Sequence, residues 1–116
     1  MSDHAVEGLD HVHVTVRNRE NAAAWYKEVL GLISPPRYNA RASDPRGPLM
    51  LTTPAGVRCL ALYAGEPRPG EQVTIAFSIS PLAFSRFLDR LEEFALEDRR
   101  GGPLRRENLV DHGGTW

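Results

Sequence analysis

The chain has 116 residues, enough for one domain with a modest hydrophobic core and too few for two. The formal net charge is −1, so the sequence lacks the basic excess typical of proteins that bind nucleic acids or membrane surfaces. No apolar run approaches membrane-spanning length. Cys59 is the only cysteine, which excludes an intrachain disulfide and fits a cytoplasmic protein.

The first predicted element is a strand over residues 9–17, where apolar and polar residues alternate. One face of this strand carries Val12, Val14 and Val16, and the other carries Leu9, His11, His13 and Thr15. A helix follows, because apolar residues recur at helical spacing between Ala22 and Val29. Asn18 suits its N-cap and Gly31 its left-handed C-cap, and Pro35-Pro36 prevents a continuation.

Three strands are predicted next, over residues 38–42, 49–53 and 57–63. The last two are joined by the turn "TPAG", and the polar Pro/Gly linker "GEPRPGE" ends this half of the chain.

The second half restarts the same pattern. Residues 72–80 alternate like a strand, and Pro81 suits the first turn of a helix with an apolar stripe from Phe84 to Phe94. Residues 108–116 can form another extended segment. The order predicts an internal repeat cut short, in which Thr74 takes the place that His11 has in the first half.

The two histidines on one strand face are the first functional signal. A strand fixes the direction of its side chains, and neutral imidazole is a good ligand for Fe, Zn, Mn or Ni. Two histidines at i and i+2 are also common as half-exposed or hydrogen-bonded residues without a ligand. The spacing of His11 and His13 alone therefore leaves both interpretations open.

Three stretches resemble the glyoxalase I / bleomycin-resistance / extradiol dioxygenase group, the vicinal oxygen chelate superfamily. "GLDHVHVTVRNRENAAAWYKEVLGL" resembles its opening strand and helix, and "VTIAFSI" resembles the matching strand of its second half. "LVDHGGTW" resembles the start of the extradiol signature. The resemblance implies an α+β fold of paired βαβββ modules that form a curved mixed sheet around a cavity. The chain would be one domain, 1–116, with a first module over 9–65 and a second over 72–116 that lacks its last two strands.

The resemblance also assigns roles to residues. His11 stands at the family's first metal-ligand position, and His13 would contact either substrate or a group that itself supports the metal ligands. The second-half ligand falls on Thr74, a substrate-binding candidate here, and the glutamate ligand position falls near Leu60. The last carboxylate ligand belongs to a strand beyond this sequence. A divalent metal (Fe, Mn, Ni or Zn) is conceivable, but one imidazole does not hold a catalytic metal, so we expect none.

His112 aligns with the acid/base histidine of the extradiol signature, although "DHGG" can equally be an ordinary turn. Tyr63 and Trp116 are the best aromatic candidates to line a substrate pocket.

Three functions follow from the resemblance. The chain can be an extradiol-type dioxygenase or glyoxalase-like metalloenzyme in which His11 binds metal and His112 handles protons. It can be a metal-free small-molecule binder of the drug-sequestering kind. It can also be a truncated module without activity of its own. Single-module members of the family build their sites across two chains, so a homodimer is expected.

Overall fold

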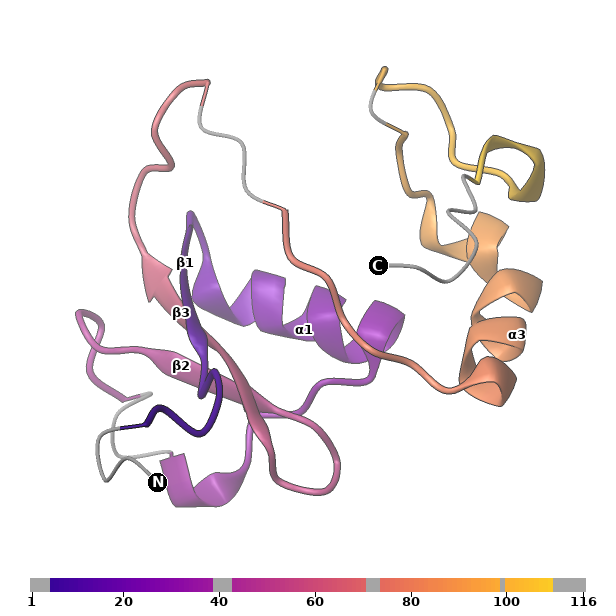
Figure 1. Cartoon of the computed structure of the whole chain (residues 1–116). Helices are drawn as coiled ribbons and strands as arrows, with labels where there is room; N and C mark the ends of the chain where they lie inside the picture. Colours follow the sequence, from indigo (N-terminus) through magenta and orange to yellow (C-terminus); the bar gives the residue numbers. More distant parts are fainter. Residues whose placement is uncertain (1–4, 39–42, 71–73, 99, 110–116) are drawn as a thin grey trace. The chain divides into compact units, whose positions relative to one another are not determined.

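A computed structural model describes residues 5–38, 43–70, 74–98 and 100–109 (Figure 1). The chain forms two compact units, Met1–Gln72 (unit 1) and Val73–Trp116 (unit 2). The boundary lies one residue after the polar linker of residues 65–71.

Unit 1 contains a three-stranded mixed sheet with the strand order β1-β3-β2. β1 (Val12–Val16) runs parallel to β3 (Arg58–Ala64), and β2 (Leu49–Thr52) runs antiparallel to β3 (Figure 1). The central strand is therefore β3, and β1 lies at one end of the order.

The two faces of this sheet differ. The helix face carries the valines of β1 and the leucines of β2 and β3: Val12, Val14, Val16, Leu49, Leu51, Leu60 and Leu62. Helix α1 (Arg19–Leu30) packs on β2 and β3, where it buries these leucines together with Val29 and Leu32. The valines of β1 are only half-buried. The other side, here called the histidine face, carries His13, Thr15, Met50, Ala61 and Tyr63.

The caps predicted for α1 are confirmed. The side chain of Asn18 accepts a hydrogen bond from the backbone N–H of Asn21, and Gly31 adopts φ 71° in the left-handed region. After α1 ends at Leu30, Pro36 begins a short 3₁₀ helix, η1 (Pro36–Tyr38). Tyr38 is therefore not part of a strand, and the rest of that predicted strand, residues 39–42, lies outside the described residues.

The β2–β3 hairpin is also confirmed, with strand ends within one residue of those predicted. Its turn is closed by backbone hydrogen bonds between Thr53 and Val57 and between Gly56 and Thr53. Gly56 adopts φ 92°, which only glycine accommodates without strain. The turn fixes the antiparallel register between β2 and β3.

Unit 2 contains α3 (Pro81–Asp89), η2 (Leu91–Phe94) and η3 (Arg106–Asn108). Ser80 caps α3 by accepting from the N–H of Ala83, and Leu91 is 1% exposed at the centre of the unit. The helix predicted from Pro81 is therefore confirmed in place, although it ends before η2.

The strand predicted over residues 72–80 is wrong for its described part, 74–80, which has no regular secondary structure. Alternation defines a strand only where a neighbouring strand pairs with it, and no strand of the described chain pairs with this segment. Its apolar side chains Phe77 and Ile79 are exposed.

The α+β class is confirmed, since the described chain combines a mixed sheet with two α-helices. None of its helices, within the described parts, is long and apolar enough to cross a membrane. The paired-module arrangement and the single-domain organisation stay predictions.

Candidate functional site

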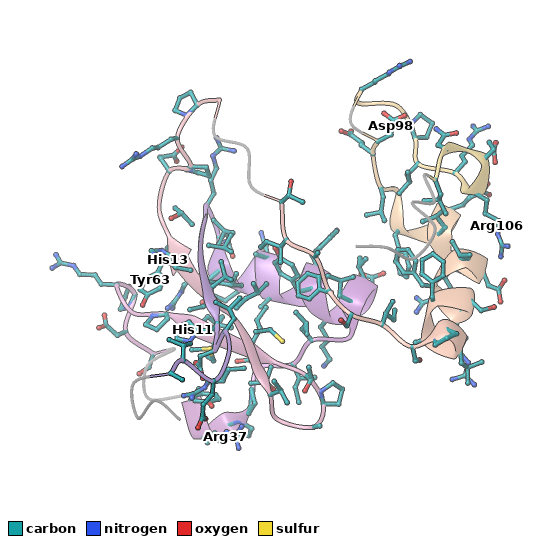
Figure 2. All side chains as sticks on the ribbon, in the orientation of Figure 1. His11, His13, Arg37, Tyr63, Asp98 and Arg106 are labelled. Carbon is teal, nitrogen blue, oxygen red and sulfur yellow. The ribbon has the colours of Figure 1, made fainter. Side chains whose placement is uncertain are left out.

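His13 and Tyr63 form an aromatic pair on the histidine face of unit 1 (Figure 2). Their ring centroids are 4.1 Å apart and the ring planes meet at 51°. The parallel register brings the two rings together. His13 is paired with Ala61 of β3, and Tyr63 lies two residues further along β3 on the same face of the sheet. His13 is exposed and Tyr63 half-buried, so the pair presents ring surface on a rigid sheet.

A second cluster lies just before β1, around the carboxylate of Asp10. Its Oδ2 atom lies 2.6 Å from Nδ1 of His11, and its Oδ1 atom accepts a hydrogen bond of 2.7 Å from Arg58. The hydrogen bond with His11 lowers the pKa of Asp10 below its ordinary value, and the positive charge of Arg58 lowers it further. The side chains of His11, Asp10 and Arg58 are 40%, 53% and 47% exposed. The cluster is therefore a surface site.

The sequence did not indicate Asp10 or Arg58, which are 48 residues apart. Their pairing depends on the register between β1 and β3, which no local pattern encodes. His11 itself lies outside the strand, one residue before β1 begins, and is exposed. It is not buried under a helix, and its predicted place on the same sheet face as His13 stays a prediction.

The described residues contain no group of three or more His, Cys, Asp or Glu side chains arranged to hold a metal ion. Leu60 lies on the helix face and is 1% exposed. A metal ligand at this position would therefore point away from the face that carries His13, whichever residue stood there. Thr74 lies in the irregular segment of unit 2 and is exposed. Within the described residues, the ligand set that the resemblance implies is therefore not brought together.

His112 and Trp116, the predicted acid/base and pocket residues, lie outside the described residues. The substrate-binding candidates His13 and Tyr63 are brought together by the sheet. His11 is two residues from His13 in sequence but its side chain contacts Asp10 instead.

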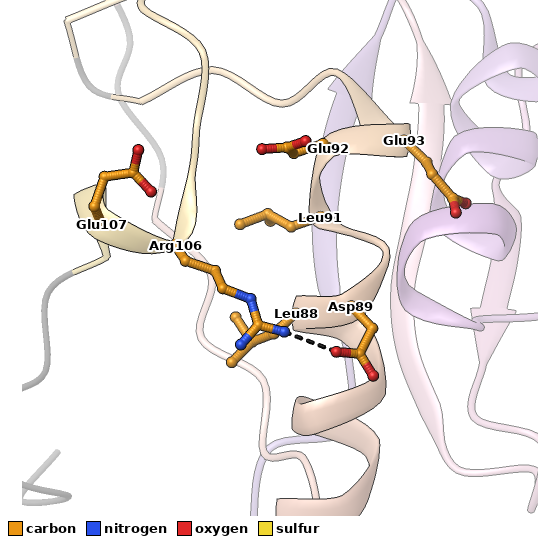
Figure 3. Close-up of a pocket in the computed structure, with 7 residues that line it drawn as sticks. All are labelled: Leu88, Asp89, Leu91, Glu92, Glu93, Arg106 and Glu107. Carbon is orange, nitrogen blue, oxygen red and sulfur yellow. Dashed lines mark hydrogen bonds and ion pairs between the residues drawn. The ribbon is translucent and has the colours of Figure 1, made fainter.

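Unit 2 holds a pocket of about 390 Å³ (Figure 3). Its lining consists of Leu88, Asp89, Leu91, Glu92, Glu93, Arg106 and Glu107. Arg106 donates a 2.7 Å hydrogen bond to Asp89, which joins η3 to α3 across the pocket. None of the predicted site residues that the structure describes lines this pocket. Among its described lining residues, one arginine stands with four carboxylates.

No protein-family model, no curated protein and no solved structure matches this chain. The resemblance to the vicinal oxygen chelate superfamily therefore stays a prediction, as do the homodimer and the small-molecule ligand.

Proposed function

We propose that this chain is a small-molecule-binding module of the vicinal oxygen chelate kind, in which a ligand lies against the histidine face without a tightly held metal. The observation that carries the proposal is the His13–Tyr63 pair. Its two rings offer aromatic surface to a planar ligand, and the imidazole and phenol add hydrogen-bonding groups.

The sheet supports this function by fixing the pair before a ligand arrives. His13 and Tyr63 stand on neighbouring strands in continuous register, and α1 packs on the opposite side of the sheet. A preorganised aromatic surface loses little conformational freedom on binding. The arrangement strand–helix–strand–strand, with its first and last strands parallel, provides three of the four strands expected for one βαβββ module.

Binding is tested by titrating a set of planar aromatic compounds into ¹⁵N-labelled protein and following the amide resonances. We expect the largest shifts in Val12–Val16 and Arg58–Ala64. Tyr63→Ala should weaken binding at least tenfold. Trp25→Ala is the matched control, because Trp25 is an exposed aromatic on α1 and should leave binding unchanged. If no compound perturbs either strand, or if Trp25→Ala weakens binding as much as Tyr63→Ala does, the proposal is wrong.

A metalloenzyme is the second candidate, favoured by the contact between Asp10 and His11. When Nδ1 of His11 carries the proton that it donates to Asp10, Nε2 is free as a metal ligand. A carboxylate that orients a ligating histidine in this way is common at metal sites. Metal analysis after purification in chelator-free buffer separates the candidates. Near one equivalent of Fe, Mn, Ni or Zn, lost in His11→Ala, would favour the metalloenzyme, whereas a substoichiometric content unaffected by His11→Ala favours the metal-free binder.

A further inference from the structure

We propose that a pocket beside α1 in unit 1 binds a medium-chain alkyl carboxylate, with the alkyl chain inside and the carboxylate on Lys27. The pocket has a volume of about 240 Å³. Its lining consists of Ala23, Ala24, Lys27, Leu32, Ile33, Ser34 and Leu51. The site does not depend on the ligand proposed for the histidine face, because Leu51 and His13 belong to opposite faces of the sheet.

The pocket forms where the chain turns back after α1. Gly31 ends the helix in the left-handed region. Ile33 then pairs with Thr52 of β2 through two backbone hydrogen bonds of 2.9 and 2.8 Å. This return places residues 32–34 along β2, on which α1 also packs, so helix, strand and returning chain enclose the space between them.

The interior of the pocket is apolar. Leu32 and Leu51, which are 5% and 0% exposed, form its base. Ala23 and Ala24 form the helix side, where longer side chains would fill the space. Each methylene group that a ligand buries against such a surface is transferred out of water at a gain in free energy. The interior therefore favours a hydrocarbon chain.

Lys27 adds a positive charge to this apolar lining. Among the lining residues that the structure describes it is the only charged one, and its side chain makes no ion pair within the described chain. Helix neighbours three and four residues away are Ala23, Ala24, Leu30 and Gly31, so α1 offers it no carboxylate at pairing distance. The charge is thus available to an anionic ligand.

The distribution of polar groups selects an amphipathic ligand. Lys27 and Ser34 are both exposed, whereas the base of the pocket is buried. A carboxylate can stay partly hydrated at the rim, pair with the ammonium group and accept a hydrogen bond from the Ser34 hydroxyl. An alkyl amine would be repelled by Lys27, and an alkyl alcohol would gain only the apolar contribution. Charge complementarity therefore selects the carboxylate.

Binding can be followed at Lys27 itself, because it is the only lysine of the chain. Lysine-selective ¹³C labelling of the full chain gives one side-chain Cε signal, which should shift on titration with butanoate, hexanoate or octanoate at millimolar concentration. Affinity should rise along this series by up to about fourfold per methylene group, the value for complete burial. The neutral control 1-hexanol should bind about fivefold more weakly than hexanoate.

Substitutions separate the charge from the cavity, with binding followed by the amide resonances of β2. Lys27→Met should weaken hexanoate binding about fivefold and leave 1-hexanol within about twofold, and Lys27→Arg should restore hexanoate binding. Arg17→Met is the matched control, since Arg17 is 75% exposed and does not line the pocket. Ala24→Leu lies at an exposed helix position that tolerates leucine, and it should weaken both ligands by filling the space.

Four results would each overturn the proposal. The first is that no carboxylate of the series shifts the Lys27 signal, as would happen if another segment of this chain fills the pocket. The second is that affinity does not rise from butanoate to octanoate. The third is that Lys27→Met binds hexanoate like the unaltered protein, or that Arg17→Met weakens binding equally. The fourth is that Ala24→Leu, with the amide spectrum of β2 and β3 preserved, binds both ligands normally.

Discussion

Truncation of Leu62 to alanine tests the packing on which the sheet of unit 1 depends. Leu62 lies in the central strand β3, between Val14 of β1 and Leu49 of β2 in the sheet register. Its side chain is 0% exposed and belongs to the helix face that α1 covers. The substitution removes apolar volume without changing any backbone hydrogen bond.

The expected cost follows from the volume removed. Three carbon groups at about 0.8 kcal/mol each give about 2.4 kcal/mol of lost transfer free energy. Because the surrounding strands and helix can close only part of the space, the residual cavity raises the loss to about 3–4 kcal/mol. That is a large fraction of the free energy of unfolding of a small unit.

Urea titration followed by the amide resonances of β2 and β3 measures this loss in unit 1 alone, with linear extrapolation to water. Leu82→Ala is the matched control, since Leu82 is 61% exposed on α3 of unit 2 and should change the stability of unit 1 by less than about 0.5 kcal/mol. A loss below about 1 kcal/mol for Leu62→Ala, at an unchanged m-value, would refute the assignment of Leu62 to the core.

Three further predictions concern the β2–β3 turn, the N-cap of α1 and the cluster around Asp10. Gly56→Ala should destabilise unit 1 by about 1–2 kcal/mol in urea titration, because φ is 92° and the new Cβ would lie 3.1 Å from the Arg37 guanidinium; no loss would contradict the turn geometry. Asn18→Ala should cost about 1 kcal/mol by the same measurement while Asn18→Asp restores the cap, and equal losses in both would exclude the capping bond. Asp10 has a lowered pKa, so its ionised form stabilises the fold above the unfolded pKa of about 3.9, and this contribution is lost as pH falls through the lower folded pKa. Asp10→Asn should therefore reduce the loss of stability as pH falls below the unfolded pKa, and an unchanged acid limb would show that the contact with His11 is not populated.

Local signals in the sequence predicted much of unit 1. These signals each act over a few residues, and the structure confirms all of them. They are the alternation around β1, the caps of α1 at Asn18 and Gly31, and the β2–β3 turn that contains Gly56. The same signals indicated that His13 and the valines lie on opposite faces. Period-two alternation fixes this assignment once the strand forms.

Long-range features could not be predicted in the same way. The bond between Asp10 and Arg58 depends on the parallel register between β1 and β3, which is set by tertiary packing rather than by neighbouring residues. Residues 74–80 show the reverse case. Their alternation matched a strand, but a strand needs a pairing partner that the described chain does not provide.

The position of His13 relative to Tyr63 and to helix α1 tests the account most directly, because the ligand face depends on it. We expect ¹³C-edited NOESY spectra to show strong cross-peaks between the His13 imidazole and the Tyr63 ring, whose centroids are 4.1 Å apart. The same spectra should show no cross-peak from the His13 imidazole to Val29 of α1, which lies on the other side of the sheet. Cross-peaks between His13 and Val29, with none to Tyr63, would contradict the arrangement of the two faces and remove the basis of the proposed binding site.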